Sequence, residues 1–290
     1  MPFIGTATGS FTAGRRANAF SAPPASSWDP STDITTAFWL DGSDTGSYTT
    51  SGSTVTSVTD KSGNFSSITV NGTPINSTTL NSLNTFTFAS GSLEDFTTDT
   101  EETIASSGNH WAIGVYQWNS INDTQDTFWS TENNTVAGTS KRDYAVSAGN
   151  ASAFNGELDL DGLASNRISS TIGNLQAFDS GIAQNTWVIL GVWFDKTGNQ
   201  IGARVNGTNA FTPVNDYDNS INSSADVRIL RNRANERMSG RMAEFFMVAA
   251  RPGSVIDPLE DFEKAEGYLA HKWALTGSLP GGHPYKTVAP

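Results

Sequence analysis

Short hydrophobic runs, separated by turn residues at close intervals, fill the middle of the chain. Runs of this kind are typical of β-strands, and many in succession are typical of an all-β sandwich or barrel. Glycine-containing turns predict hairpins, a longer one over Phe194–Ile201 and a tight one over Val205–Thr208. The predicted strands are Thr36–Leu40, Ser53–Val58, Thr85–Phe88, Trp111–Trp118, Thr127–Ser130, Tyr144–Ser147, Glu157–Leu160, Arg167–Ile172, Thr186–Asp195, Ile201–Val205, Val227–Leu230 and Arg241–Ala249.

Over residues 257–275 the apolar residues recur at the spacing of a helix instead of that of a strand. Asp257 suits the N-cap, Pro258 suits the first helical position, and Glu260 completes a capping box. We expect one apolar stripe of this helix to pack on the sandwich, with Gly277 and Pro280 following its end. The stripe consists of Leu259, Phe262, Ala265, Leu269 and Trp273, with Glu266 as a polar alternative to Ala265.

Residues 1–30 have no hydrophobic period and are rich in Gly, Ala, Ser and Pro. They carry Arg15 and Arg16, and no acidic residue precedes Asp29. This composition is typical of an extended arm or linker, and the alternative is a disordered tail. The sequence therefore predicts an N-terminal arm over 1–30 and one domain over 31–290.

Composition and charge exclude several classes of function. The 290 residues include no Cys, which excludes a disulfide framework, a thiolate metal site and a Cys nucleophile. A formal net charge of -12 argues against nucleic acid as a partner, because phosphate contacts need a surplus of Lys and Arg. No apolar run is long enough to span a membrane, and the first residues lack the usual pattern of a secretory signal.

Several blocks of the sequence resemble one known family. They are Phe38-Trp-Leu-Asp-Gly-Ser-Asp44, Val58-Thr-Asp-Lys-Ser-Gly-Asn64, Leu80-Asn-Ser-Leu-Asn-Thr-Phe-Thr-Phe88, Glu244-Phe-Phe-Met-Val248 and Glu263-Lys-Ala-Glu-Gly-Tyr-Leu-Ala-His-Lys-Trp-Ala-Leu-Thr-Gly-Ser-Leu-Pro-Gly-Gly-His-Pro-Tyr285. The blocks resemble the laminin-G-like, concanavalin A-like jelly rolls of bacteria and tailed phages. The last block is similar to the C-terminal helix and tail of that family and is the most specific.

The resemblance implies a two-sheet antiparallel sandwich with Greek-key connections. Virion proteins of marine phages often carry this domain after a short start containing Gly, Ala and Arg, and this sequence is similar to them. We therefore expect a non-enzymatic structural protein at the virion surface, as a capsid decoration, a fibre or a tail component. Phage architecture, rather than the residues, suggests a homo-oligomer such as a trimer, with other virion proteins as partners. The expected anchoring residues are Phe3, Phe11, Arg15, Arg16 and Phe20.

A carbohydrate-active enzyme, or its binding module, is a less favoured alternative. Glu157, Asp159 and Asp161 alternate along the chain, so they would share one side of a strand, as the carboxylates of concanavalin-like glycosidases do. A retaining glycosidase needs two carboxyl groups about 5 Å apart. Asp161 is one carbon shorter than the Glu of that motif and precedes Gly162 in a turn. We therefore expect a polar face on this strand and no catalytic residues.

A glycan-binding protein of the virion that attaches to the host surface is the main alternative function. Sugars bind exposed aromatic rings that have planar hydrogen-bonding side chains nearby. The tryptophans within apolar runs belong to the core in this interpretation: Trp39, Trp111, Trp187, Trp193 and Trp273. The candidates for the surface have polar neighbours in the sequence: Trp118, Trp129, Arg142, Tyr144 and Tyr217.

Calcium is the usual cation of this fold and takes six to eight oxygen ligands. Some would come from Asp216, Asp218, Asn219 and Asn222, or from Asp41, Asp44 and Asp60. Neither set has the fixed spacing of a calcium loop, and turns rich in Asx residues explain both. The sequence therefore predicts no cofactor, with calcium as the alternative.

Arginines gather near the C-terminal end of the strand region: Arg228, Arg231, Arg233, Arg237, Arg241 and Arg251. One interpretation is internal pairing with the acidic surplus of the chain. The other is a basic patch that meets an acidic partner subunit, because Arg suits ion pairs at interfaces.

Overall fold

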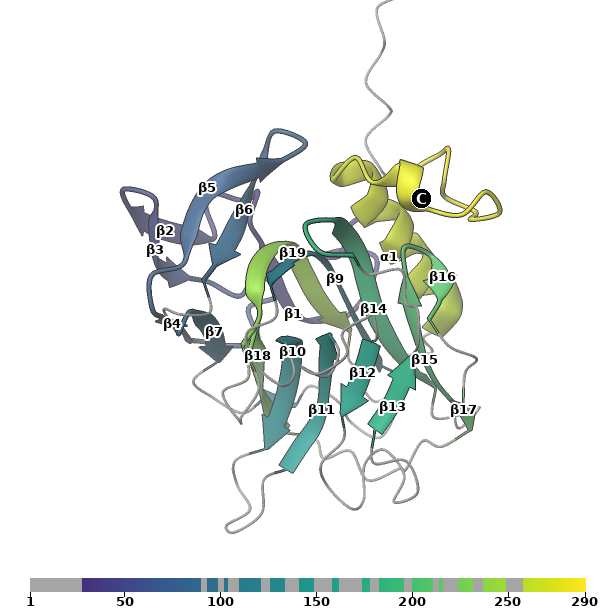
Figure 1. The fold of residues 1–290 in the computed structure, drawn as a ribbon, viewed down its shortest axis with the longest axis horizontal. Coiled ribbons are helices and arrows are strands. Elements are labelled where there is room, and N and C mark those ends of the chain that lie inside the picture. The colour runs from purple at the N-terminus through teal and green to yellow at the C-terminus, as the bar shows by residue number, and fades with distance from the viewer. Residues whose placement is uncertain are drawn as a thin grey trace, which may run out of the picture.

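Two antiparallel β-sheets and a C-terminal helix make up this computed structural model (Figure 1). The structure describes residues 28–89, 93–98, 102–103, 110–120, 126–133, 141–148, 158–161, 174–177, 183–195, 200–210, 214–215, 224–231, 237–248 and 258–290. The predicted all-β sandwich is confirmed. The described residues contain no helix that is long and apolar enough to cross a membrane.

The larger sheet, sheet A, has the strand order β16-β15-β14-β9-β19-β6-β5-β3-β2, with β1 also paired to β19 and β17 to β15. Its strands are β1 Thr36–Asp41, β2 Tyr48–Ser51, β3 Thr54–Val58, β5 Ile75–Leu80, β6 Leu83–Phe88, β9 His110–Ser120, β14 Trp187–Asp195, β15 Gln200–Val205, β16 Thr208–Asn209, β17 Val214–Asn215 and β19 Ser239–Val248.

The smaller sheet, sheet B, has the order β13-β12-β11-β10-β18-β7-β4, and β8 pairs with β18. Its strands are β4 Ile68–Asn71, β7 Asp95–Thr98, β8 Glu102–Thr103, β10 Asp126–Asn133, β11 Lys141–Ala148, β12 Leu158–Asp161, β13 Asn174–Ala177 and β18 Ser224–Ile229.

An inner core fills the space between the two sheets. Alternate residues of a strand point to opposite faces, so Phe86 and Phe88 of β6 enter this core together while Thr87 points away. Phe96 of β7 meets both phenylalanines edge to face, with ring centroids 5.2 and 4.9 Å away. Such aromatic contacts join sheet A to sheet B across the sandwich.

A second, outer core lies between sheet A and the helix α1, Pro258–Lys272. The helix buries Phe262, Ala265, Leu269 and Trp273 against β9 and β14. The expected helix is confirmed, and so are four members of its stripe, while the side chain of Leu259 is not described. Glu266, the polar alternative to Ala265 in the stripe, is also buried, so both residues belong to the buried face of the helix.

Helix α1 ends at Lys272, earlier than the predicted end at residue 275, and Gly277 and Pro280 follow it as expected. Ala274 adopts a positive φ of 56°, and the Leu275 N–H donates to the Ala270 carbonyl at 2.7 Å, as in a Schellman cap. The helix therefore ends before Gly277, and the short 3₁₀ turn Thr276–Ser278 follows. An alanine takes the left-handed position because the chain must turn there to bury Leu279.

Sheet A forks along one edge of β19. The first part of β19 pairs with β6 and the last part with β1, and a bulge separates them between Met242 and Glu244. Gly42 lies in the fork, where a Cβ would meet the carbonyl oxygens of Asn84 at 2.9 Å and Ala243 at 3.0 Å. Only glycine leaves room for this approach of backbones.

Most predicted strands have counterparts within a few residues, and both predicted hairpins are present as β14–β15 and β15–β16. The predicted strand Arg167–Ile172 lies outside the described residues. Strands in polar stretches were not predicted: β2, β4, β5, β7, β8, β13 and β17, while β16 follows the predicted tight hairpin. The β5–β6 turn also escaped notice because it consists of Asn81 and Ser82, both at positive φ, without a glycine.

We predict that Gly42→Ala lowers the free energy of unfolding by about 1–3 kcal/mol, because the new methyl group meets backbone atoms that have little room to move. Urea denaturation measures this change. Gly281→Ala is the matched control, since no atom lies within 4 Å of its added Cβ. Equal stability of the two variants would contradict the close approach at the fork.

Candidate functional site

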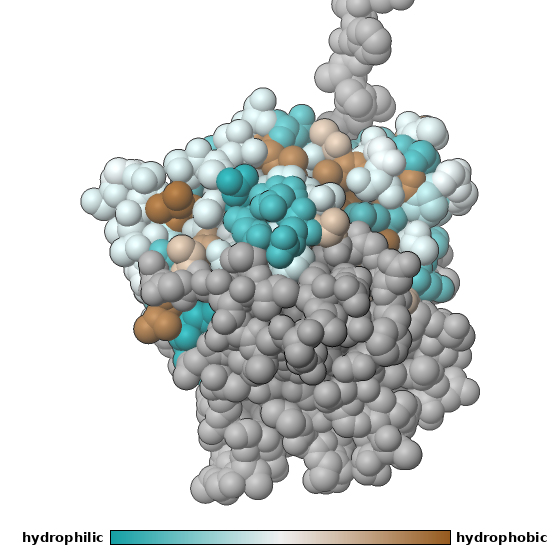
Figure 2. Space-filling model, viewed as in Figure 1, coloured by the Kyte–Doolittle hydropathy of each residue, from teal (hydrophilic) through white to brown (hydrophobic). Residues whose placement is uncertain are grey.

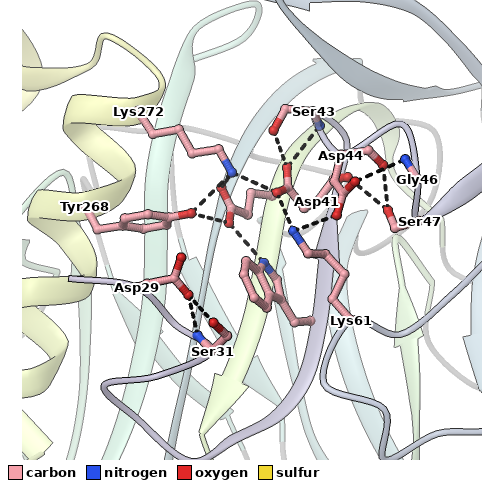
Figure 3. Close-up of polar contacts among 12 residues, drawn as sticks. Asp29, Ser31, Asp41, Ser43, Asp44, Gly46, Ser47, Lys61, Tyr268 and Lys272 are labelled. Carbon is pink, nitrogen blue, oxygen red and sulfur yellow. Dashed lines mark hydrogen bonds and ion pairs between the residues drawn. The ribbon is translucent and has the colours of Figure 1, made fainter. Parts of the chain in front are cut away.

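The largest buried ionic cluster lies where β1, β19 and α1 meet (Figure 3). The Lys272 ammonium at the end of α1 lies 2.7 Å from a Glu244 oxygen and 2.9 Å from an Asp41 oxygen. Lys61 bridges Asp41 and Asp44 at 3.0 Å each. We call Asp41, Lys61, Glu244, Tyr268 and Lys272, with the indoles that bind Glu244, the ionic lock.

Glu244 is completely buried, and every donor around it is fixed by another element. It accepts hydrogen bonds from the indoles of Trp39 at 3.0 Å and Trp273 at 2.8 Å, and from the Tyr268 hydroxyl at 3.1 Å. Burial raises the pKa of the Glu244 carboxyl, and the charge of Lys272 partly offsets this effect.

The two partners of Lys272 keep it charged. Burial alone would lower the pKa of Lys272, but Glu244 and Asp41 outweigh it and raise that pKa. Burial likewise opposes ionisation of Asp41, and its pKa is nevertheless lowered because Lys272, Ser43 and Lys61 stabilise the carboxylate. The lock is therefore a largely buried cluster of paired charges that joins helix to sheet, and the side chains of Lys61 and Lys272 are each 19 % exposed.

Two further clusters join distant segments. Arg204 of β15 donates to Glu266 of α1 at 3.0 Å and to the Gly207 carbonyl at 2.7 Å, and His283 lies 3.1 Å from Glu266. These contacts explain why the helix tolerates an acid on its buried stripe, since a buried charge needs partners.

The arginine cluster is mostly paired internally. Arg231 and Arg237 lie 3.4 and 3.3 Å from the buried carboxylate of Asp95, and Arg228 lies 3.1 Å from Asp226. Arg233 and Arg251 lie outside the described residues. Arg241 differs from these paired arginines, as shown below.

The candidate calcium ligands have other partners. Asp41 and Asp44 share the Lys61 ammonium, and Asp60 accepts hydrogen bonds from the backbone N–H groups of Trp39 and Phe65. Across the described residues no three His, Cys, Asp or Glu side chains are grouped to hold a metal ion. The second candidate set lies outside the described residues: Asp216, Asp218, Asn219 and Asn222.

The expectation that Trp118 and Trp129 lie at the surface is wrong. Their exposed fractions are 1 % and 0 %, and both belong to the inner core. Trp129 stacks on Tyr116 with ring centroids 5.8 Å apart. Their neighbours in the sequence are polar because strand residues alternate, so a polar neighbour marks the opposite face and not an exposed tryptophan.

The other predicted site residues stay predictions. Arg142 and Tyr144 belong to β11, whose side chains the structure does not describe, and Tyr217 lies outside the described residues. The expected anchors also lie outside them: Phe3, Phe11, Arg15, Arg16 and Phe20. Of the alternating acids, Glu157 lies outside, and Asp159 and Asp161 belong to β12, with Asp161 in the strand rather than in a turn.

Four neighbouring strands of sheet A place one side chain each in a continuous row. In the strand register Trp187 of β14 lies opposite Gln117 of β9, Gln117 lies opposite Arg241 of β19, and Arg241 lies opposite Thr87 of β6. Opposed residues of antiparallel strands share a face, and adjacent strands lie about 4.8 Å apart. This polar row therefore crosses about 14 Å of the sheet.

The polar row faces away from the inner core, on the side of sheet A that carries α1. The outer core beneath α1 reaches as far as Val115 and Ile189, which lie opposite each other on β9 and β14. The polar row is the next row of paired residues on this face, and it begins with Gln117 and Trp187. Trp187 is half-buried at the border, with one side packed on the outer core. Figure 2 shows hydrophilic side chains gathered between the β5–β6 hairpin and the helix.

Polar contacts hold the residues around this row. The Gln117 amide donates to the Asn185 carbonyl at 2.9 Å. The Thr78 hydroxyl lies 2.8 Å from that of Thr85 and 2.7 Å from that of Thr87, so three hydroxyls cluster at one end. Sequence reasoning missed the row, although strand alternation next to Trp118 was the signal that would have placed Gln117 outside.

Comparison with known proteins gives distant structural likeness alone. No family model and no curated protein matches the chain. Domain 4 of AbnA, a GH43 extracellular arabinanase from Geobacillus stearothermophilus, in complex with arabinotriose, is 14 % identical over 65 % of this chain and 85 % of that one, with a TM-score of 0.47. The Ruminococcus gnavus IT-sialidase CBM40 bound to α2,3-sialyllactose is 13 % identical over 53 % and 80 %, with a TM-score of 0.40. The W1252A mutant of HCR D/C VPI 5995 is 11 % identical over 74 % and 48 %, with a TM-score of 0.49.

We predict that Lys272→Met lowers the free energy of unfolding by about 3–5 kcal/mol, because it leaves the buried carboxylate of Glu244 without its ammonium partner and leaves Asp41 with Lys61 alone. Guanidinium denaturation measures the loss. Lys264→Met on the same helix is the control: its partner Asp261 is 3.7 Å away at the surface, and we expect a change below about 1 kcal/mol. If Lys272→Met costs no more than this control, the lock is not the attachment we describe.

Proposed function

We propose that this protein is a non-catalytic glycan-binding sandwich whose ligand lies along the polar row of sheet A. The observation that carries the proposal is the row itself, in which the register aligns an indole, an amide, a guanidinium and a hydroxyl on one face of sheet A, where Trp187, Arg241 and Thr87 are partly exposed. These are the groups that hold a sugar, because they offer an apolar ring and planar or hydroxyl hydrogen-bonding partners.

Rigid positioning supports this proposal. Gln117, Arg241 and Thr87 are on strands that are paired on both sides at these positions, and Trp187 is paired with β9, so the backbone of the row is fixed before any ligand arrives. The hairpin tip is also fixed, since the Asn81 amide donates to the Lys272 carbonyl at 2.9 Å. Pre-arranged groups lose less conformational freedom on binding, which favours affinity.

The carboxylates of the described core support a role without catalysis. Hydrolysis of a glycosidic bond uses two carboxyl groups on either side of the bond. The polar row contains none, and the buried acids Asp41, Asp95, Glu244 and Glu266 are each bound to a lysine or an arginine. A bound sugar would therefore be held without being cleaved.

We predict that Trp187→Ala and Thr87→Val each weaken glycan binding about tenfold or more, which corresponds to about 1.4 kcal/mol. Trp187→Ala removes the ring, and Thr87→Val removes one hydroxyl while conserving the shape of the side chain. A glycan array followed by calorimetry on the best ligand measures the effect. Thr56→Val is the control, since Thr56 is exposed on β3, away from the row. No bound glycan, or equal affinity in all variants, would refute the proposal.

A place at the virion surface is a separate proposal, and it rests on the family resemblance of the sequence. In this role residues 1–27 would attach the sandwich to other virion proteins. Trp28 would be the first residue of the sandwich side, because its ring packs on Phe246 and Tyr268 with centroids 6.4 and 5.5 Å apart.

We predict that deletion of residues 2–27 abolishes loading onto particles and leaves the melting temperature unchanged, because the contacts of Trp28 are retained. Quantification of the protein in purified particles and a thermal melt measure the two quantities. A truncated protein that loads at the normal copy number would sink the anchoring role.

A further inference from the structure

We propose that Arg241 is an anion subsite within the polar row and that the glycan bound there is acidic, with a carboxylate or sulfate group on the guanidinium. This inference rests on the proposed glycan-binding function and names the class of ligand. It follows from the position and the missing partner of one arginine.

Arg241 has no counterion among the described residues. Arg204, Arg228, Arg231 and Arg237 each lie within 3.4 Å of a carboxylate, but no hydrogen bond or ion pair joins the Arg241 side chain to another described residue. Its Nε is buried without a hydrogen-bond partner there. A chain with 29 acidic and 17 basic residues has acids in surplus, so this lack of a partner is unexpected.

The surroundings of Arg241 suit an external anion. Its register neighbours Gln117 and Thr87 are neutral hydrogen-bonding residues, so nothing in the row competes for the guanidinium. Glu244, beyond the bulge of β19, is fully committed to Lys272 and the two indoles. A partly buried arginine attracts an anion more strongly than an exposed one, and its planar fork fits a carboxylate or sulfate with two hydrogen bonds.

An acidic glycan fits this face better than an acidic peptide. Extended peptides add to the free edge of a sheet, where backbone groups are unpaired. The polar row crosses β9, β19 and β6, which have strands on both sides, and so offers side chains rather than an edge. The partly exposed hydroxyls of Thr78 and Thr87 and the half-buried ring of Trp187 add the contacts expected for a sugar.

The test compares three polysaccharides by calorimetry on the full chain: polygalacturonate with carboxylates, dextran sulfate with sulfates, and neutral dextran. We expect one of the acidic polymers to bind at least tenfold more tightly than dextran, and the better one identifies the anionic group. Arg241→Gln should remove at least tenfold of that affinity, and Arg241→Lys should keep part of it, since it retains charge but not the planar fork. Lys264→Met is the matched control, because it removes one positive charge elsewhere, and it should bind like the parent protein.

A second measurement separates binding from folding. Because Arg241 has no partner among the described residues, Arg241→Gln should leave the melting temperature unchanged or raise it. A clear drop would assign Arg241 a structural role and overturn the inference.

The outcomes also separate this inference from the proposed function. A neutral glycan that depends on Trp187 and Thr87 but not on Arg241 would keep the proposed function and overturn the anion subsite. Loss of affinity in Arg241→Gln equal to that in Lys264→Met would show an effect of net charge and also overturn it. Polyglutamate is measured alongside the polysaccharides as an acidic polypeptide, and stronger binding of it than of both acidic polysaccharides would assign the face to an acidic protein instead. If none of these polymers binds, the proposal of an acidic ligand is refuted.

Discussion

The attachment of α1 to sheet A through the Glu244 carboxylate is the constraint on which the rest of the structure depends. A carboxylate removed completely from water must have its oxygens satisfied by donors in fixed positions. Those donors come from β1, from α1 and from the residue that follows it, so residues 39, 244, 268, 272 and 273 are brought to one point. The helix is thereby fixed in position and rotation as well as held by its apolar stripe.

The same point organises the fork of sheet A. Glu244 follows the bulge at which β19 changes its partner from β6 to β1, and Asp41 at the end of β1 shares Lys272 with it. Gly42 then lets the chain cross close to the backbone of β6. The ionic lock and the fork therefore determine how far the helix covers the sheet, and the polar row begins where that cover ends.

The proposed binding role depends on which charged side chains have partners within the molecule and which do not. The buried carboxylates of Asp41, Asp95, Glu244 and Glu266 are paired with cations within the molecule, and those of Asp60 and Glu94 accept hydrogen bonds from backbone N–H and hydroxyl groups. Arg241 lacks such a partner among the described residues, unlike the other arginines whose side chains are described, and it is partly exposed in a row of hydrogen-bonding groups.

The sequence by itself determined the all-β class, the hairpins β14–β15 and β15–β16, and the helix with its buried stripe. Local periodicity carries this information, because alternation and 3.6-residue spacing need no knowledge of partners. Local periodicity did not predict β5 and the Asn81-Ser82 turn that follows it, because polar threonines on an outward face weaken the hydrophobic signal. Only the tertiary structure decided that Trp118 is core, that Glu266 is buried against Arg204, and that Gln117, Arg241 and Thr87 form one row. These facts depend on which elements become neighbours and in what register, and the free energy of that choice lies in contacts between residues far apart in the sequence, such as Arg204 and Glu266, which are 62 positions apart.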